Sequence, residues 1–212
     1  DYDLAIDYHG YGHFITTFVA EKVHAKKKIM WIHDEKTDFL SKVENYIPYF
    51  DKIFAVGKSC MNNAIKQMPS IESKIDVFYN MSDYQNIIAK SNEKIDFTFP
   101  KDSFNILTIG RLEWQKGYDI ALETAKILND RKINFRWFAL GQGSIKEKIE
   151  KKIKEYNLED KFILLGIANN PYPYIKQADI FVLTSRHEGY CLSTLEARIL
   201  NKPIVATDIE SN

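Results

Sequence analysis

The chain has 212 residues, of which 45% are hydrophobic, 27% charged and 13% aromatic, which excludes disorder and allows one large or two small cores. Its 29 basic and 29 acidic side chains give a formal net charge of zero, so no overall charge attracts nucleic acid or anionic lipid. The apolar runs are shorter than the roughly 20 residues of a membrane helix, and two distant cysteines predict no disulfide framework. We therefore expect a soluble cytoplasmic protein that binds a membrane at most peripherally and has no nucleic-acid partner.

Short apolar runs alternate with amphipathic segments of helical length, which is typical of a parallel sheet covered by helices on both faces. The predicted strands lie at 4–8, 28–33, 52–57, 76–80, 104–110, 135–141, 161–166, 180–185 and 203–207, and the clearest helices at 117–132 and 144–157. Because the pattern is interrupted after residue 81, we predict a first domain at 1–81, a linker at 82–103 and a second domain at 104–212. The first domain is expected to be truncated, since it has about four predicted strands and the second has five, in the order of a complete doubly wound unit. Because the chain starts and stops close to predicted strands, we expect it to be a piece of a longer protein.

The loop after strand 104–110 carries two cations close to the start of a helix. It reads Gly110-Arg-Leu-Glu-Trp-Gln-Lys-Gly117, which places Arg111 and Lys116 on one short loop. In open parallel sheets, ligands bind at the carboxyl ends of the strands. Cationic side chains and free amides at a helix N-terminus suit a diphosphate. The alternative is a loop with two solvated charges, and this segment alone does not decide between the two.

The loop after strand 180–185 and the helix that follows it contain two carboxylates, Glu188 and Glu196. Paired carboxylates accept hydrogen bonds from the hydroxyl groups of sugars and riboses. Gly189 permits a close backbone approach. The amides that follow it are expected at a helix N-terminus that faces the ligand, namely those of Tyr190, Cys191 and Leu192. The spacing of the two carboxylates is common by chance, but the residues around them make this pattern much rarer.

Three other segments give weaker signals. Gly141-Gln-Gly143 lacks the third glycine of a dinucleotide fingerprint, so we expect no nicotinamide or flavin site. His33 ends the strand 28–33. It either donates a hydrogen bond to a phosphate or a sugar hydroxyl, or is an imidazole packed in the interior, and the residues alone favour neither role. Metal ligation by residues 33–35 is not expected, since adjacent strand residues point to opposite faces. The run from His9 to His13 either lines the same cleft or forms a tight strand-to-helix turn, and the turn is favoured.

Six segments together resemble the retaining sugar-nucleotide glycosyltransferases of family four, also called group 1. In chain order they are Ile106 to Asp119, Ala139 to Gly143, Ile163 to Gly166, Ala178 to Ser185, Glu188 to Ala197 and Lys202 to Asp208. In the first half the likeness is to the acceptor-side domain of bacterial capsule and exopolysaccharide members, over Lys28 to His33, Phe50 to Gly57 and Val77 to Asn80. The resemblance implies two Rossmann-like domains that face each other across a cleft, the GT-B fold, without a metal or another cofactor.

The resemblance also implies an activity, namely transfer of a hexose from a nucleoside diphosphate sugar, with UDP the expected nucleotide, to a saccharide or lipid-linked saccharide acceptor. The configuration of the sugar would be retained. Arg111 and Lys116, on the loop that begins at Gly110, would bind the diphosphate and stabilise the charge on the leaving nucleotide. Glu188 and His33 would lie at the donor sugar. The ribose and base would be met by Glu196 and by the backbone of Gly166 and Ile167, and the phosphate or sugar by the amides after Gly189.

Two features of the family are missing from this sequence: the glycine-rich loop after its first strand and the segment after Asn212 that crosses back to the first domain. We therefore expect a nearly intact nucleotide half-site and little or no transferase activity from the 212 residues alone. By analogy, the whole protein would act in cell-envelope or capsular polysaccharide synthesis at the inner face of the cytoplasmic membrane. The alternative function is a non-catalytic nucleotide-sugar-binding protein or partner subunit. Phosphorylase-like and epimerase-like proteins of the same layout are disfavoured, because neither a pyridoxal-phosphate lysine site nor the epimerase loop pattern is found.

Overall fold

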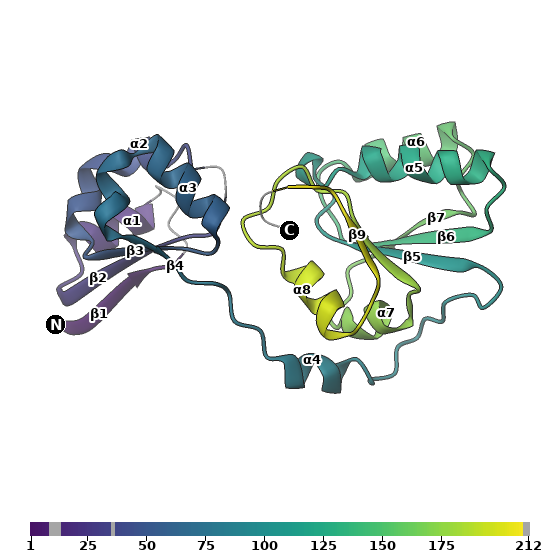
Figure 1. The fold of residues 1–212 in the computed structure, drawn as a ribbon, viewed down its shortest axis with the longest axis horizontal. Coiled ribbons are helices and arrows are strands. Elements are labelled where there is room, and N and C mark those ends of the chain that lie inside the picture. Colours follow the sequence, from purple (N-terminus) through teal and green to yellow (C-terminus); the bar gives the residue numbers. More distant parts are fainter. Residues whose placement is uncertain (9–13, 35–36, 210–212) are drawn as a thin grey trace. The chain divides into compact units, whose positions relative to one another are not determined.

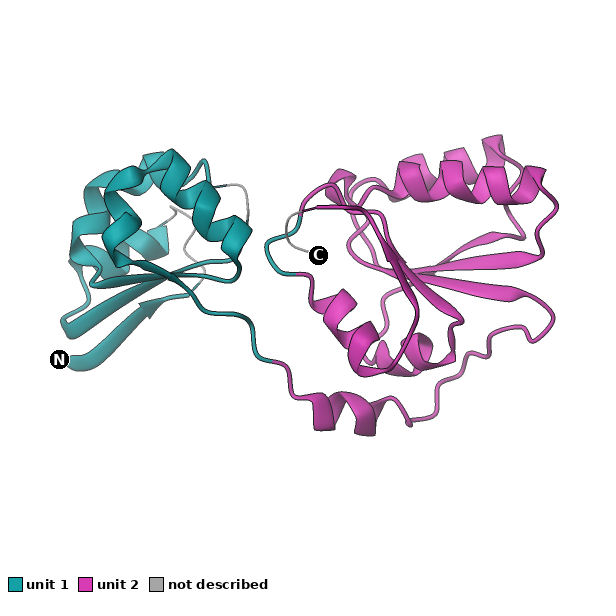
Figure 2. Ribbon diagram, in the orientation of Figure 1, with its two compact units in different colours: residues 1–81, 188–190, 211 teal, residues 82–187, 191–210, 212 magenta. Residues whose placement is uncertain are grey.

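The computed structural model describes residues 1–8, 14–34 and 37–209, which form two compact units (Figure 1, Figure 2). Among the described residues, unit 1 holds 1–81 and 188–190, and unit 2 holds 82–187 and 191–209. Each predicted strand occurs in this part of the chain, with ends that differ by up to three residues. The run from His9 to His13 and Glu35, both considered above, lie outside the described residues.

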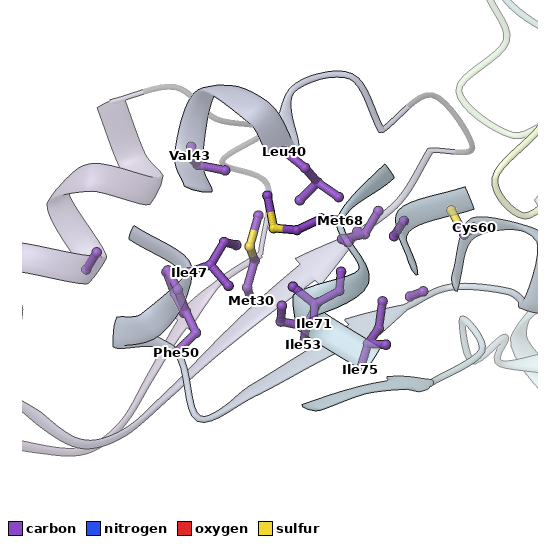
Figure 3. Close-up of a cluster of buried hydrophobic side chains, with 14 of the residues drawn as sticks. Met30, Leu40, Val43, Ile47, Phe50, Ile53, Cys60, Met68, Ile71 and Ile75 are labelled. Atoms are coloured by element: carbon purple, nitrogen blue, oxygen red, sulfur yellow. The ribbon is translucent and has the colours of Figure 1, made fainter. Parts of the chain in front are cut away.

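Unit 1 is built on a parallel sheet whose helices lie on one face (Figure 1). Its strands, in their order across the sheet, are β1 (Tyr2–Asp7), β2 (Ala25–Ile32), β3 (Lys52–Ala55) and β4 (Ile75–Val77). They are connected by α1 (Phe14–Glu21), α2 (Leu40–Val43), α3 (Lys58–Gln67) and the 3-10 turns Glu44–Tyr49 and Pro69–Lys74. Alternate strand residues, such as Met30 and Ile53, point to these helices and form the core with Leu40, Ile47 and Ile71 (Figure 3).

The opposite face of this sheet is apolar but uncovered within the described part of unit 1. Leu4 and Ile6 of β1 are exposed. Next to them, the rings of Trp31, Phe54 and Phe78 contact one another, with centroid distances between 5.0 and 5.6 Å. Parallel sheets are usually covered on both faces. The two-sided covering that the sequence predicts is therefore realised on one face only in this unit.

Unit 2 is a parallel sheet with helices on both faces. Across the sheet its strands run β7 (Phe162–Gly166), β6 (Phe135–Leu140), β5 (Phe104–Ile109), β8 (Ile180–Leu183) and β9 (Ile204–Ala206). Helices α5 (Tyr118–Asp130) and α6 (Lys146–Glu155) cover one face, and α7 (Tyr172–Gln177) and α8 (Leu192–Ile199) cover the other (Figure 1). Helix α4 (Tyr84–Lys90) packs against α7 and α8. Numbered within the unit, the order is 3-2-1-4-5, which is that of a doubly wound Rossmann-like sheet.

Successive residues of the central strands enter different cores of unit 2, which explains their continuous hydrophobicity. In β6, Trp137 packs under α5 and α6, while Phe138 packs on the opposite side of the sheet. The buried indole of Trp137 donates a hydrogen bond to Thr108 Oγ1 at 3.0 Å, and that hydroxyl donates to the carbonyl of Val182 at 2.8 Å. A fully buried polar pair is thus satisfied inside the sheet.

The segment 82–103, expected as a linker, contains α4 and packs with unit 2. Asp83 caps α4 by accepting from the amide of Asn86 at 3.0 Å. At its other end, the side-chain amide of Asn170 donates to the carbonyl of Lys90 at 2.9 Å. The ring of Phe99 lies 4.8 Å from that of Phe138, centroid to centroid. These contacts join α4 and the chain after it to unit 2, while the roles of the two domains stay predictions.

Candidate functional site

The strand order of unit 2 reverses between β5 and β8, which makes the carboxyl ends of these two strands the expected ligand crevice of the sheet. The loop after β5 runs from Gly110 to Gly117 and contains the 3-10 turn Trp114–Lys116. The loop after β8 runs from residue 184 to the start of α8. The residues predicted to bind the diphosphate and the ribose therefore belong to neighbouring connections at one edge of one sheet.

The segment after β6 is joined to the loop after β5 by two backbone hydrogen bonds and by a close backbone contact. The amide of Leu112 donates to the carbonyl of Gln142 at 3.0 Å, and that of Ile145 donates to the carbonyl of Leu112 at 3.1 Å. Gly141 has a φ of +151°, and a Cβ there would lie 1.9 Å from the carbonyl oxygen of Gly110. The glycines of the segment 141–143 thus have a packing role at this loop.

The residues that follow β8 contact the other end of the same loop. Gly117 has a left-handed φ of +64°, and a Cβ there would lie 2.0 Å from the carbonyl oxygen of Thr184. The hydroxyl of Thr184 donates to the carbonyl of Lys116 at 2.9 Å, and the amide of Arg186 donates to that of Gln115 at 2.8 Å. The backbone that carries the two predicted diphosphate ligands is therefore fixed on both sides.

The two cations of this loop differ in their surroundings. The stem of Lys116 packs over Gly110, where an added Cβ would lie 3.2 Å from Lys116 Cδ, and Arg111 is exposed. Glu113, between them in sequence, accepts from both the amide and the hydroxyl of Ser144, at 2.9 and 2.7 Å. These hydrogen bonds hold the pKa of Glu113 below its usual range, with a smaller contribution from Arg111. The carboxylate thus anchors the loop to the start of the α6 region.

Helix α8 carries the predicted ribose ligand. Cys191 precedes the helix and Leu192 begins it, while the Cys191 thiol accepts a hydrogen bond from the hydroxyl of Thr194 at 2.8 Å. Glu196 is half-buried one turn further, and the phenol of Tyr172 donates to its Oε1 at 3.3 Å. Burial raises the pKa of Glu196, and the hydrogen bond from Tyr172 partly opposes this shift. A carboxylate held where burial disfavours its charge is typical of a ligand-binding position.

The end of β7 offers open backbone. Gly166 has a φ of +75°, its carbonyl accepts from the amide of Gly141 at 2.7 Å, and a Cβ at this position would meet no atom within 4 Å. Ile167, which follows, is 61% exposed. The register between β6 and β7 shifts at this point. Contact of this backbone with a nucleobase stays a prediction.

Four predicted site residues belong to unit 1. Glu188, Gly189 and Tyr190 group with unit 1, as does His33. The Nε2 of His33 lies 2.7 Å from the carbonyl oxygen of Tyr8, which can only accept, so Nε2 carries the proton. Their common site with the loops of unit 2 stays a prediction. Within the described residues, no group of three or more His, Cys, Asp or Glu side chains is arranged to hold a metal, and no helix is long and apolar enough to span a bilayer.

Sequence reasoning missed the residues that support the loop after β5. Arg186 and Asp119 are paired in the structure but 67 positions apart in sequence, and Tyr172 meets Glu196 from a different helix. One signal was available: Arg186 directly follows the predicted strand 180–185, so the carboxyl-end rule places it beside the loop after β5. Nothing in the spacing identifies Asp119 as its partner.

Comparison with known proteins gives a family match and curated relatives. Residues 89–212, more than half of the chain, match the family described as "Glycosyl transferases group 1". An N-acetylgalactosamine-N,N'-diacetylbacillosaminyl-diphospho-undecaprenol 4-alpha-N-acetylgalactosaminyltransferase of Campylobacter jejuni is 31% identical over 182 residues, which is 83% of this chain and 48% of that protein. The chain spans about half the length of the curated relatives it matches first.

Two solved structures share the fold. A variant of S. aureus TarM, in complex with Fondaparinux, alpha-GlcNAc-glycerol and UDP, superposes with a TM-score of 0.77 at 24% identity, over 98% of this chain and 41% of TarM. The pneumococcal O-GlcNAc transferase GtfA, in complex with UDP and GlcNAc, has a TM-score of 0.74 at 16% identity, over 97% of this chain and 42% of GtfA. These matches confirm the predicted fold class, α/β with two Rossmann-like parallel sheets. The family match over residues 89–212 and the 31% identical relative show that the chain belongs to the group 1 glycosyl transferases.

Proposed function

We propose that this chain carries the nucleotide-sugar half-site of a retaining hexosyltransferase whose whole protein transfers the sugar to a saccharide acceptor. One observation carries the proposal: Arg111 and Lys116 lie on a doubly anchored loop at the switch point of unit 2, and α8 with Glu196 begins at the same edge of the sheet. Two cations on rigid backbone suit a diphosphate, and they would stabilise the charge that develops on the leaving nucleotide.

The nucleotide is proposed to be UDP. TarM and GtfA, which share the fold, are both seen with UDP. In this chain, the exposed backbone after β7 would meet the base, and Glu196 would accept hydrogen bonds from the ribose hydroxyls. Glu188 and His33 are proposed to contact the donor sugar, and the amides at residues 190–192 the phosphate or sugar. The acceptor is proposed to be a cell-envelope or capsular saccharide, free or lipid-linked, met at the cytoplasmic membrane face.

Calorimetric titration of the 212-residue chain with UDP, GDP, ADP and their hexose conjugates tests the nucleotide half-site. UDP and UDP-hexoses are expected to bind more tightly than the other nucleotides. Glu196→Gln is expected to weaken UDP about 10-fold, since a carboxylate accepts charge-assisted hydrogen bonds worth about 1.5–3 kcal/mol. Absence of nucleotide binding to a sample whose circular dichroism shows a folded α/β protein would refute the half-site.

Glu196 also gives the chain a pH-dependent stability of known sign. Because burial raises its pKa, the folded state favours the protonated form; this contribution is present in full below the ordinary value of 4.5 and is lost as the pH rises through the raised value. Gln is neutral throughout, so Glu196→Gln is expected to match the wild type in stability near pH 4 and to exceed it at pH 7. Urea unfolding at both pH values measures the difference.

A second variant checks the cause of this pH dependence. Tyr172→Phe removes the hydrogen bond that lowers the pKa of Glu196, so the stability lost between pH 4 and pH 7 is expected to grow relative to the wild type. If Glu196→Gln leaves the pH profile of unfolding unchanged, the carboxyl is not disfavoured by burial, and the argument from its pKa for a ligand-binding role is removed.

A further inference from the structure

We propose that Arg186 is a positioning residue of the diphosphate site: it ties the loop that carries Arg111 and Lys116 to the first turn of α5, and it does not bind the phosphates itself. The proposal rests on the proposed function, because it assigns a role within that site. Arg186 lies just after β8, and a cation in this loop would ordinarily be taken for a third phosphate ligand. Its contacts argue against that reading.

The guanidinium of Arg186 makes several contacts within unit 2. Its Nη1 donates to Asp119 Oδ1 at 2.8 Å and its Nη2 to Asp119 Oδ2 at 2.5 Å, which is the bidentate geometry of a strong pair. The same Nη1 donates to the carbonyl of Trp114 at 3.0 Å. The guanidinium carbon lies 3.7 Å from the centre of the Trp114 ring, so the group is also stacked on the indole. Its charge is compensated by Asp119, and both of its terminal nitrogens donate hydrogen bonds.

These contacts join three segments at the carboxyl ends of β5 and β8. Trp114 belongs to the loop after β5, Asp119 to the first turn of α5, and Arg186 to the loop after β8. The backbone supports the same connection, since the amide of Arg186 donates to the carbonyl of Gln115 at 2.8 Å and the Gln115 side chain donates to the carbonyl of His187 at 2.9 Å. Gln115 and Lys116 are adjacent, so whatever orders this turn sets the direction of the Lys116 stem.

The connection requires arginine in particular. A lysine at position 186 keeps the charge, but it lacks the planar fork that meets both carboxylate oxygens and the flat face that stacks on Trp114. A direct electrostatic role for Arg186 toward phosphate would survive this change in large part. A role as a mere surface ion pair would give almost no effect on any substitution, since exposed pairs contribute about 0–1 kcal/mol. The two substitutions Arg186→Met and Arg186→Lys therefore separate the three roles.

The experiment measures the affinity of the chain for UDP and for uridine by ligand-observed NMR, in the wild type, Arg186→Met, Arg186→Lys and a control variant. Lys126→Met is the matched control, because it removes an exposed ion pair with Asp130 from the same helix, α5. Both Arg186 variants are expected to weaken UDP about 10-fold, which corresponds to about 1.4 kcal/mol, and to leave uridine unchanged. Lys126→Met is expected to change neither affinity.

Three outcomes overturn the proposal. Unchanged UDP affinity in Arg186→Met would make the residue a surface ion pair. Equal weakening of UDP and uridine would indicate a general structural role. Recovery of UDP affinity in Arg186→Lys would indicate a direct charge on the phosphates. If the wild type binds no UDP, the proposed function fails on its own; hydrogen exchange of the amides at 112–117 then still tests the positioning role, which predicts faster exchange in Arg186→Met than in Lys126→Met.

Discussion

Replacing Gly117 with alanine is expected to destabilise unit 2 by more than about 4 kcal/mol, an effect that single substitutions rarely reach. Two costs combine at this position. The φ of +64° is left-handed and costs an ordinary residue about 1–2 kcal/mol. In addition, the new Cβ would lie 2.0 Å from the carbonyl oxygen of Thr184, which is backbone at the end of β8 and has little freedom to move. The start of α5 and the end of β8 cannot both keep their places.

Gly166→Ala is the matched control for this prediction. Its φ of +75° imposes the same kind of backbone strain, but a Cβ there meets no atom within 4 Å. We expect a loss of only about 1–2 kcal/mol from this substitution. Hydrogen exchange followed segment by segment measures both variants without assuming that the two units unfold together, and unit 1 serves as an internal reference. Equal losses at the two positions would show that strain alone, and not the approach of Thr184, requires glycine at residue 117.

Removing the two cations of the loop after β5 is expected to give the largest functional effect. We expect Arg111→Gln and Lys116→Met each to weaken UDP about 10- to 100-fold, since a hydrogen bond to a charged group is worth about 1.5–3 kcal/mol. Methionine is chosen at residue 116 because the stem of Lys116 packs over Gly110, and a side chain of similar length keeps that packing. Uridine, which has no phosphate, is expected to bind both variants as it binds the wild type.

The same calorimetric and NMR titrations include two control substitutions in unit 2. Arg131→Gln removes a cation at the end of α5, and Lys151→Met removes one from the exposed side of α6. Neither is expected to change the affinity for UDP beyond the effect of net charge. If the control variants lose as much affinity as Arg111→Gln and Lys116→Met, then UDP responds to the overall charge of the unit, and the loop after β5 is not the diphosphate site.

The positions of Arg111, Lys116 and Glu196 were predictable because each depends on a local pattern. Apolar runs mark where a strand ends, and parallel strands bring their carboxyl ends to one edge. The supporting contacts did not follow from such patterns. The pairing of Arg186 with Asp119 depends on β8 lying beside β5, and the strand order is a property of the whole sheet.

The sequence by itself determined the α/β class, the strands and the loops that carry the candidate site. Strands and turns depend on the pattern of apolar residues and glycines within a few neighbouring positions, and that pattern can be seen in the sequence. Only the tertiary structure decided that 82–103 packs on unit 2 through α4, that one face of the sheet of unit 1 is uncovered in its described part, and that Gly117 and Gly141 are where neighbouring loops come closest. Those facts depend on which segments meet after folding, and close packing between residues far apart in sequence leaves no periodic trace in the sequence itself.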